Sequence, residues 1–482
     1  MARHLATGRE NPIFYYGSAY GGTLEPRFVA GMFQLFGATI ATYRASLVVL
    51  LVLWLAIVWE IGRRTLGKPA ALSAVLFLAV PPYYLLYKGL SSDGFYTTLA
   101  LLGAGMLLAA VRLDESVAAD APADRWVALL GLLAGLGLWV TPLIAYFYLA
   151  IVLWLLVVQR RALFRARHVL VGVLFFGAGS LPWWLGNARS GWPSVRSPAV
   201  RELSASAFVH NFVRFWTDGV PVLFGGRPYT RRDEVFPGSS FLAFCVFALA
   251  VAVAMVAVVR QGARRSREDS PSACPPARYL LLLLLSVFCM QAVVSVSPST
   301  YLPEPRFLLP IYAPCALLIG YALDQLRGRS RAAFLAAPLA LAAFNATSIA
   351  RAPKQEDFLT LPTTGSVGPL VEALEERRLH DAYIGYWTGY RVAFESGERI
   401  RPAAFGVGSD RWDRYPPYAE EVRKAPNPAV VLRGETAEGF ARYLAKRGQR
   451  FDSVRVGPHT VFWNLDPSVL EQIRATLDVP RD

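Results

Sequence analysis

The sequence predicts a mainly α-helical, polytopic membrane protein with a small soluble α/β domain at its C-terminal end, and three observations support this. The chain of 482 residues is 54% hydrophobic and only 17% charged, which is too apolar for an ordinary soluble protein of this size. Its apolar residues gather in ten segments of about the length needed to cross a bilayer as a helix. The last third of the chain instead alternates between strand-like and helix-like patterns.

The excess of basic residues lies in the apolar part of the chain. Residues 351–482 carry 19 Lys and Arg against 19 Asp and Glu, so the formal net charge of +14 comes from residues 1–350. Basic residues that flank membrane spans indicate topology rather than affinity for nucleic acid, and we expect no nucleic-acid partner. The composition also excludes a cytosolic enzyme and a disordered chain. The four cysteines and five histidines lack pairing or ligand spacing, which predicts neither a disulfide framework nor a zinc site.

Residues 1–41 are expected to form an outer loop that contains an interfacial helix over residues 26–36. Residues 15–25 interleave aromatic side chains with glycine, which places flat apolar rings on a backbone that a ligand can approach closely. Such a platform suits sugar rings. The same composition fits an aromatic cluster that anchors a re-entrant turn at the membrane interface.

The membrane core is predicted over residues 42–350. The run over 126–159 is too long for one span, and we divide it at Pro142, because the residue before a proline disfavours helix. Pro81 and Pro82, and the segment 179–182, are expected to interrupt helices near their outer ends. The predicted spans are 42–61, 69–87, 95–112, 126–141, 142–159, 168–187, 238–259, 279–296, 307–326 and 332–350.

Arginines are concentrated in alternate connections between these spans, which predicts which connections are cytoplasmic. The connection over 188–236 also carries arginines, but it is about fifty residues long, and the rule weakens for long loops. Ten crossings place residues 1–41 and the C-terminal tail together on the outer side. The arginine-rich connections hold Arg63, Arg64, Arg112, Arg125, Arg160, Arg161, Arg165, Arg167, Arg260, Arg264, Arg265, Arg267, Arg278, Arg327, Arg329 and Arg331.

Residues 351–482 are predicted to form the small α/β domain. We find no dinucleotide-binding fingerprint, P-loop or nucleophile elbow in it. Its helices are expected over 367–379, 386–394 and 435–447, and its strands over 381–385, 399–404, 429–433, 450–456 and 459–465.

Three acidic residues lie in short outer connections directly beside apolar spans, and each has a basic residue nearby. The pairs are Glu25 with Arg27, Asp93 with Lys88, and Glu304 with Arg306. Ionisable groups at such a boundary are paired, extended to the interface or functional. Each pair could be a salt bridge that fixes a loop, and three pairs on one face could also form a shared polar site.

Several segments resemble bacterial membrane glycosyltransferases related to the protein O-mannosyltransferase and aminoarabinose transferase families. Residues 3–37, with PIFYYG and YGGTLE, resemble the first outer loop of those proteins. Residues 179–184 (GSLPWW), with Asn187 and 191–193 (GWP), resemble the end of a later helix. Residues 304–312 (EPRFLLPIY) resemble a late outer loop, and 386–399 and 414–418 resemble the tail.

This resemblance implies a transferase of the GT-C fold class in the bacterial cytoplasmic (inner) membrane, with the C-terminal domain periplasmic or extracellular. It implies an active site on the outer face, a polyprenyl-phosphate-linked sugar as donor, and a lipid, glycan or protein acceptor. A carboxylate would take the proton of the acceptor hydroxyl, and polyprenyl phosphate would leave as an anion. An apolar groove for the lipid and cations for the phosphate fit the apolar, arginine-rich core.

The predicted site gathers these residues in one outward-facing cavity. Glu25 and Asp93 are the candidates for acceptor activation, or for holding a divalent cation, Mg²⁺ or Mn²⁺. Arg306, helped by Lys88, is expected to bind the donor phosphate, because arginine stays charged and binds phosphate bidentately. The remaining predicted members are Glu304, Arg27, Tyr16, Tyr20 and Trp184.

The resembled families begin with a further membrane helix followed by an acidic residue, the expected base. Met1 lies where their first outer loop is already under way, which implies that such a helix precedes this sequence or that the chain is a shortened member. Two other classes therefore stay open, a lipid or solute transporter and a non-catalytic membrane scaffold. A transporter would favour ionisable or helix-breaking positions near mid-membrane and inverted repeats, and we detect no repeat.

Overall fold

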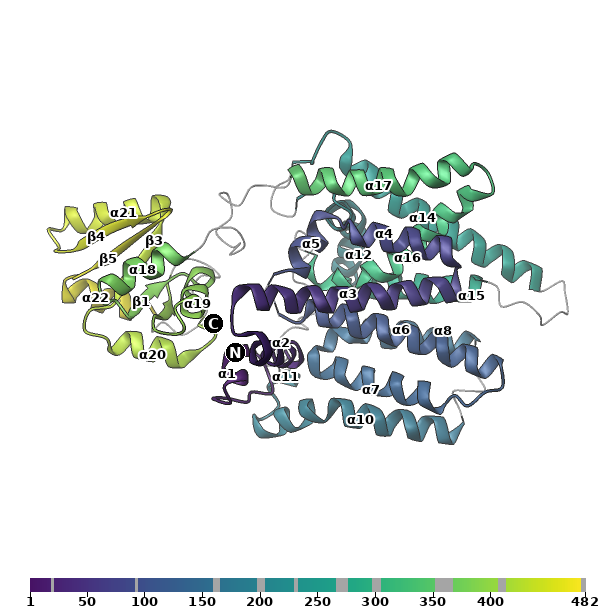
Figure 1. Ribbon diagram of the computed structural model, residues 1–482, viewed down its shortest axis with the longest axis horizontal. Coiled ribbons are helices and arrows are strands. Elements are labelled where there is room, and N and C mark those ends of the chain that lie inside the picture. Colours follow the sequence, from purple (N-terminus) through teal and green to yellow (C-terminus); the bar gives the residue numbers. More distant parts are fainter. Residues whose placement is uncertain are drawn as a thin grey trace. The chain divides into compact units, whose positions relative to one another are not determined.

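A computed structural model describes residues 1–18, 21–91, 94–158, 165–196, 204–228, 233–265, 276–296, 305–351, 367–405 and 413–477. The chain divides into two compact units (Figure 1). Unit 1 comprises Met1–Tyr15 and Ala19–Ala352, and unit 2 comprises Tyr16–Ser18 and Pro353–Asp482.

Unit 1 is built from helices, and helices lie at all ten predicted spans. Two short helices precede the first long one, and the second of them, α2, covers the predicted interfacial helix. The bounds are α1 Ala2–Ala6, α2 Leu24–Phe36, α3 Ile40–Thr65, α4 Lys68–Ala79, α5 Tyr83–Gly89, α6 Tyr96–Ala118, α7 Asp124–Val140, η1 Pro142–Ile144, α8 Ala145–Val158, α10 Ala166–Arg189, α11 Pro193–Arg196, α12 Ala205–Arg214, η2 Phe215–Gly219, α13 Val220–Leu223, α14 Ser239–Arg265, α15 Ala277–Val296, η3 Arg306–Ile311, α16 Tyr312–Arg327 and α17 Arg331–Arg351.

Seven helices of the described chain are long and apolar enough to cross a membrane, and α4 with α5 makes an eighth if this bent pair is one span. The pair is bent by 70° at Pro81 and Pro82, as predicted. The division at Pro142 is also confirmed, because α7 ends at Val140 and Thr141 is extended, with φ −170°. The 17-residue α7 is at the lower limit of the length of a span, and the shorter apolar segment Pro142–Val158 combines η1 and α8.

The predicted break at residues 179–182 is wrong, because α10 runs without interruption through Pro182. Close packing against α7 explains this continuity. A Cβ atom on Gly135 of α7 would lie 2.2 Å from the carbonyl oxygen of Phe176, and one on Gly179 would lie 2.5 Å from that of Leu132. Small residues thus let the two backbones touch along their length. Packing of this kind supports a helix that has lost one hydrogen bond to a proline.

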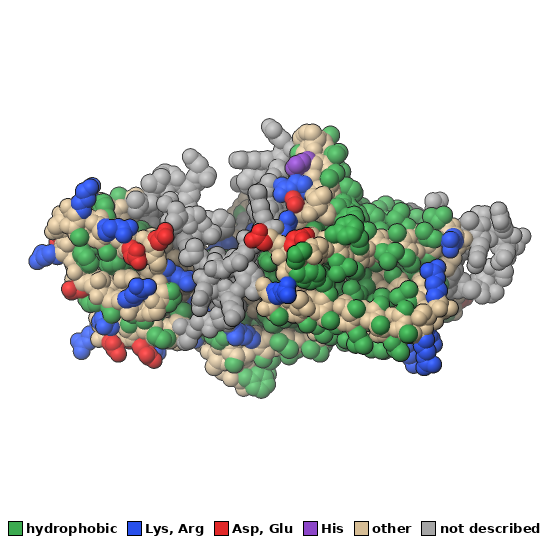
Figure 2. Space-filling model, turned by 90° about the horizontal axis from the view of Figure 1, so that it is seen from above, with side chains coloured by type: hydrophobic (Ala, Val, Ile, Leu, Met, Phe, Trp, Pro, Cys, Tyr) green, Lys and Arg blue, Asp and Glu red, His purple; other side chains and the backbone are tan. Residues whose placement is uncertain are grey.

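Hydrophobic side chains cover much of the face of unit 1 seen in Figure 2, and Lys and Arg lie toward the ends of this hydrophobic surface. On α10 the exposed fractions of Leu170, Val173 and Leu174 are 69%, 63% and 65%. Large apolar side chains exposed in such numbers indicate a surface that contacts lipid. The interior holds bulky residues such as Trp54, Trp154 and Tyr312, all nearly inaccessible.

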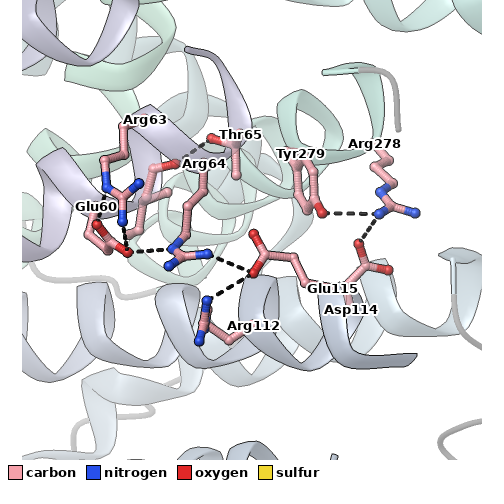
Figure 3. Close-up of polar contacts among 10 residues, drawn as sticks. Glu60, Arg63, Arg64, Thr65, Arg112, Asp114, Glu115, Arg278 and Tyr279 are labelled. Atoms are coloured by element: carbon pink, nitrogen blue, oxygen red, sulfur yellow. Dashed lines mark hydrogen bonds and ion pairs between the residues drawn. The ribbon is translucent and has the colours of Figure 1, made fainter. Parts of the chain in front are cut away.

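A network of ion pairs joins the ends of α3, α6 and α15 (Figure 3). The fully buried carboxylate of Asp114 lies 2.6 Å from the guanidinium of Arg278, which also donates to the Tyr279 hydroxyl at 3.0 Å. The next residue of α6, Glu115, accepts hydrogen bonds from the guanidinium groups of Arg64 at 3.0 Å and of Arg112 at 3.3 Å. Removal of Arg278 would leave the buried charge of Asp114 unpaired, so this pair holds α6 and α15 together.

Unit 2 contains a five-stranded mixed sheet, and all five predicted strands are confirmed. The strand order is β2-β1-β3-β5-β4, with β2, β1 and β3 parallel and β5 antiparallel to both neighbours. Tyr383 and Val430 face one apolar cluster, while Ile384 and Val431 face another, so both faces of the sheet are covered. The strands are β1 Asp381–Ile384, β2 Arg401–Ala404, β3 Ala429–Arg433, β4 Asp452–Val456 and β5 His459–Trp463.

The helices of unit 2 are α18 Gly368–Glu376, α19 Tyr386–Glu395, α20 Pro416–Lys424, α21 Gly434–Lys446 and α22 Pro467–Leu477. The sequence prediction missed α20 and α22. Both begin at a proline, which is favoured in the first helical turn. In α20 the buried residues Tyr418, Ala419 and Val422 have helical spacing. The hydrophobic pattern of the sequence therefore indicated this helix, although the prediction missed it.

Candidate functional site

The N-terminal loop of unit 1 is held firmly against the end of α7. Phe14 and Gly22 form an antiparallel bridge, and the Tyr15 N–H donates to the Gly21 carbonyl at 2.7 Å. The Gly22 N–H donates to the Val140 carbonyl at 3.0 Å. A Cβ atom on Gly22 would lie 2.2 Å from the Trp139 carbonyl oxygen, so only glycine fits here. The loop thereby delivers the chain into α2 at a fixed position.

Glu25 lies in the first turn of α2 and is 4% exposed. Its carboxylate accepts a hydrogen bond from the Thr98 hydroxyl of α6 at 2.9 Å. Burial raises the pKa of Glu25 to about 7, although the bond from Thr98 acts in the opposite direction. Burial and the nearby Glu25 charge also raise the pKa of Tyr15 well above its usual value. A carboxyl with a pKa near neutrality can accept and release a proton at physiological pH.

The first turn of α6 contacts the three elements that carry Glu25, Lys88 and Arg306. Thr98 donates to Glu25 of α2, and the Thr97 hydroxyl donates to the Gly89 carbonyl of α5 at 3.3 Å. The Tyr96 ring lies 6.1 Å from the Phe307 ring of η3. Gly89 directly follows Lys88, and Phe307 directly follows Arg306. Glu25, Lys88 and Arg306 are therefore carried by three elements that surround one helical turn.

Both cations of this group lie beside aromatic rings. The Lys88 ammonium is 4.9 Å from the centre of the Tyr87 ring, and the side chain is 4% exposed. The Arg306 guanidinium lies 5.3 Å from the centre of the Phe307 ring. The Tyr146 hydroxyl donates to the Phe307 carbonyl at 3.1 Å, which fixes the start of η3. A positive charge held beside an aromatic ring keeps its position with little rotamer freedom.

Arg27 holds the loop together. Its guanidinium donates to the Thr23 hydroxyl at 3.2 Å and to the Pro12 carbonyl at 3.1 Å, and it lies 5.7 Å from the centre of the Trp139 ring. Burial lowers the pKa of Arg27 below its usual value. These contacts give Arg27 a structural task at the base of the loop, beside the role predicted for it at the edge of a substrate site.

The contacts of Tyr16 and Trp184 that the structure describes are with residues outside α2, α5, α6 and η3. Tyr16 belongs to unit 2, where its ring lies 4.8 Å from that of Tyr415. Trp184 of α10 is 45% exposed, and its indole N–H donates to the Ser180 hydroxyl at 3.1 Å. Its ring lies 6.0 Å from that of Trp192. Exposed tryptophans at and just beyond the end of an apolar helix are typical of an aromatic belt at the membrane interface.

Three predicted members, Asp93, Glu304 and Tyr20, lie outside the described residues. Within the described part, no group of three or more His, Cys, Asp or Glu could hold a metal ion. Glu25 is the described half of the predicted Mg²⁺ or Mn²⁺ pair. The sequence prediction missed Thr97 and Thr98, whose signal is that they directly precede the apolar run over residues 99–111 of α6.

A sequence model of the dolichyl-phosphate-mannose-protein mannosyltransferase family matches residues 25–185. This stretch begins at Glu25 and includes Lys88 and the first turn of α6. The structure is similar to that of ArnT from Cupriavidus metallidurans bound to undecaprenyl phosphate, with a TM-score of 0.59, 14% identity, and coverage of 100% of this chain and 93% of that one. The structure has the GT-C fold of this membrane glycosyltransferase.

Two oligosaccharyltransferase structures from Archaeoglobus fulgidus share this GT-C fold. One, in complex with Zn and sulfate, has a TM-score of 0.52, with 14% identity and coverage of 96% of this chain and 68% of that one. The other, AglB with an inhibitory peptide and a dolichol-phosphate, has a TM-score of 0.50, with 14% identity and coverage of 100% and 70%. A comparison of the sequence with curated proteins found no match. The fold class predicted from the sequence is confirmed.

Proposed function

We propose that this protein transfers a sugar from a polyprenyl-phosphate-linked donor to an acceptor hydroxyl, at the outer face of the bacterial cytoplasmic membrane. The observation that carries the proposal is the first turn of α6, which contacts the elements of Glu25, Lys88 and Arg306. A buried acid and two cations gathered in this way match the needs of a transfer that moves a proton and releases a phosphate.

Glu25 and Asp93 are the candidates for the base. In the transfer, the base removes the proton of the acceptor hydroxyl, and the acceptor oxygen forms a bond to the anomeric carbon of the sugar. Glu25 with a pKa of about 7 is poised for this task, since the deprotonated fraction is large at neutral pH while the carboxylate remains basic.

Arg306, helped by Lys88, binds the donor phosphate in this proposal. As the bond between the anomeric carbon and the phosphate oxygen breaks, the electron pair stays on the phosphate, and the leaving polyprenyl phosphate becomes more negative. Guanidinium and ammonium groups held beside aromatic rings stabilise this developing charge without having to reorganise. Among the relatives, one ArnT structure is bound to undecaprenyl phosphate and one AglB structure contains a dolichol-phosphate, which supports a lipid-phosphate donor here.

In an alternative form of the proposal, Glu25 and Asp93 bind a divalent cation, Mg²⁺ or Mn²⁺, instead of acting as the base. Such an ion would neutralise the donor phosphate. The fit is partial, because Glu25 is bonded to Thr98 and must ionise against its burial before it can act as a ligand. Transfer in the presence of EDTA, with Mg²⁺ added back, separates the two uses.

The decisive experiment is transfer of radiolabelled sugar from a polyprenyl-phosphate donor by the purified chain in lipid nanodiscs. We expect Glu25→Gln, Asp93→Asn and Arg306→Ala each to lower the rate by about 10²-fold or more, because each removes a base or a phosphate partner. The control Glu438→Gln removes an exposed acid of α21 and should leave the rate unchanged. No transfer by the folded wild type would favour the scaffold, and movement of intact lipid across the bilayer would favour the transporter.

A further inference from the structure

A second polar feature lies toward the opposite end of α6 from the candidate site. Arg112 is 14 residues beyond Thr98 on this helix, which corresponds to about 21 Å along the axis. The guanidinium of Arg112 lies 4.6 Å from the centre of the Trp126 ring at the start of α7, and that of Arg125 lies 4.9 Å from the same centre. One indole ring thus holds two arginines close together.

The local carboxylates do not neutralise this pair. Glu115 pairs with Arg112, but it also pairs with Arg64 (Figure 3). In the described part of the chain, Arg125 forms no ion pair, and neither does the exposed Asp120 in the connection between α6 and α7. The ion pairs of the described chain therefore give Arg112 one shared carboxylate and Arg125 none, which leaves a site for an anion.

An apolar surface begins beside this site. Asp124 of α7 forms an ion pair with Arg167 at 2.7 Å, which joins the first turns of α7 and α10. From there Leu170, Val173 and Leu174 continue along α10 with exposed fractions of 69%, 63% and 65%. Positions spaced in this way lie on one face of a helix. A cationic headgroup site followed by an exposed apolar stripe has the shape and chemistry of a bound phospholipid.

We propose that Arg112, Trp126 and Arg125 bind the phosphate of an anionic bilayer phospholipid whose acyl chains lie along α10. This ligand is separate from the donor of the proposed transferase, because the site lies toward the other end of α6. Anionic lipid is the source that fits, since a free phosphate would make no use of the apolar stripe.

The test is native mass spectrometry of the full chain with phosphatidylglycerol or phosphatidylcholine of identical acyl chains. Wild type should retain one phosphatidylglycerol in clear preference to phosphatidylcholine. Each arginine near a lipid phosphate contributes about fivefold in affinity, so Arg125→Gln should weaken phosphatidylglycerol binding by about that factor, and Arg112→Gln with Arg125→Gln further. Arg125→Lys, which keeps the charge, should retain part of the preference.

The matched control is Arg329→Gln with Arg331→Gln, which removes two exposed arginines, one in the connection between α16 and α17 and one at the start of α17. It should keep the wild-type preference. Equal retention of both lipids by wild type, unchanged affinity in Arg125→Gln, or an equal loss in the control would each overturn the proposal. Arg125→Gln disrupts no ion pair of the described chain, so its folding is not in question.

Discussion

At the scale of single residues, the Thr98–Glu25 hydrogen bond controls the predicted base. A buried carboxylate without partners would stay protonated well above neutral pH, and hydrogen bonds from the hydroxyl and the backbone of Thr98 counteract this by favouring the ionised form. The hydroxyl bond also joins α2 to α6. Thr98 thereby influences both the position and the protonation of Glu25.

We expect transfer to fall as the pH drops below about 7, because protonated Glu25 cannot accept the acceptor proton. Thr98→Val removes a bond that lowers the pKa, so the midpoint of the pH–rate profile should move upward, by about one unit. Thr98→Ser keeps the hydroxyl and should keep the wild-type midpoint. A profile that is identical in all three proteins would show that ionisation of Glu25 does not limit transfer.

At the scale of elements, the contact between α7 and α10 rests on glycines. Gly135→Val would place a branched side chain where a Cβ atom already lies 2.2 Å from a backbone carbonyl oxygen. The helices would have to separate, and overpacking of this kind costs about 1–3 kcal/mol or more. We therefore expect a lower thermal midpoint in detergent. Gly177→Val on α10 is the control, because a Cβ atom there meets nothing within 4 Å, and it should differ from wild type only by helix propensity.

The elements also show what could be predicted from the sequence. The ten helical segments, the break at Pro81 and Pro82, and the five strands follow from hydropathy, proline and period-two patterns, which are local. The continuity of α10 through Pro182 depends on its packing against α7, which a local pattern does not contain. The contact of Thr98 with Glu25 joins positions 73 residues apart. The sequence pattern was enough to predict Glu25 as a site residue. Its hydrogen-bond partner, Thr98, could be identified only from the three-dimensional structure.

At the scale of the whole molecule, topology depends on whether the bent pair α4–α5 crosses the membrane. Its 70° bend fits either a broken span or a re-entrant loop. A crossing gives the even number of spans that places residues 1–41 and unit 2 on the same side, whereas a re-entrant loop places them on opposite sides. The candidate site requires the first arrangement, because Glu25 of α2 and Arg306 of η3 must share one face with the acceptor.

Labelling with a membrane-impermeant thiol reagent in intact cells tests on which sides unit 2 and the connection between α16 and α17 lie. With the native cysteines replaced, Ser453→Cys in the exposed part of β4 should be labelled, since unit 2 is expected outside. Ser330→Cys, in the arginine-rich connection between α16 and α17, should be labelled only after the cells are permeabilised. The two positions are separated in the chain by α17, so the expected difference between them requires this helix to cross the membrane. Labelling of Ser330→Cys alone in intact cells would reverse the topology and place the arginines, with the lipid site at Arg112 and Arg125, on the outer face.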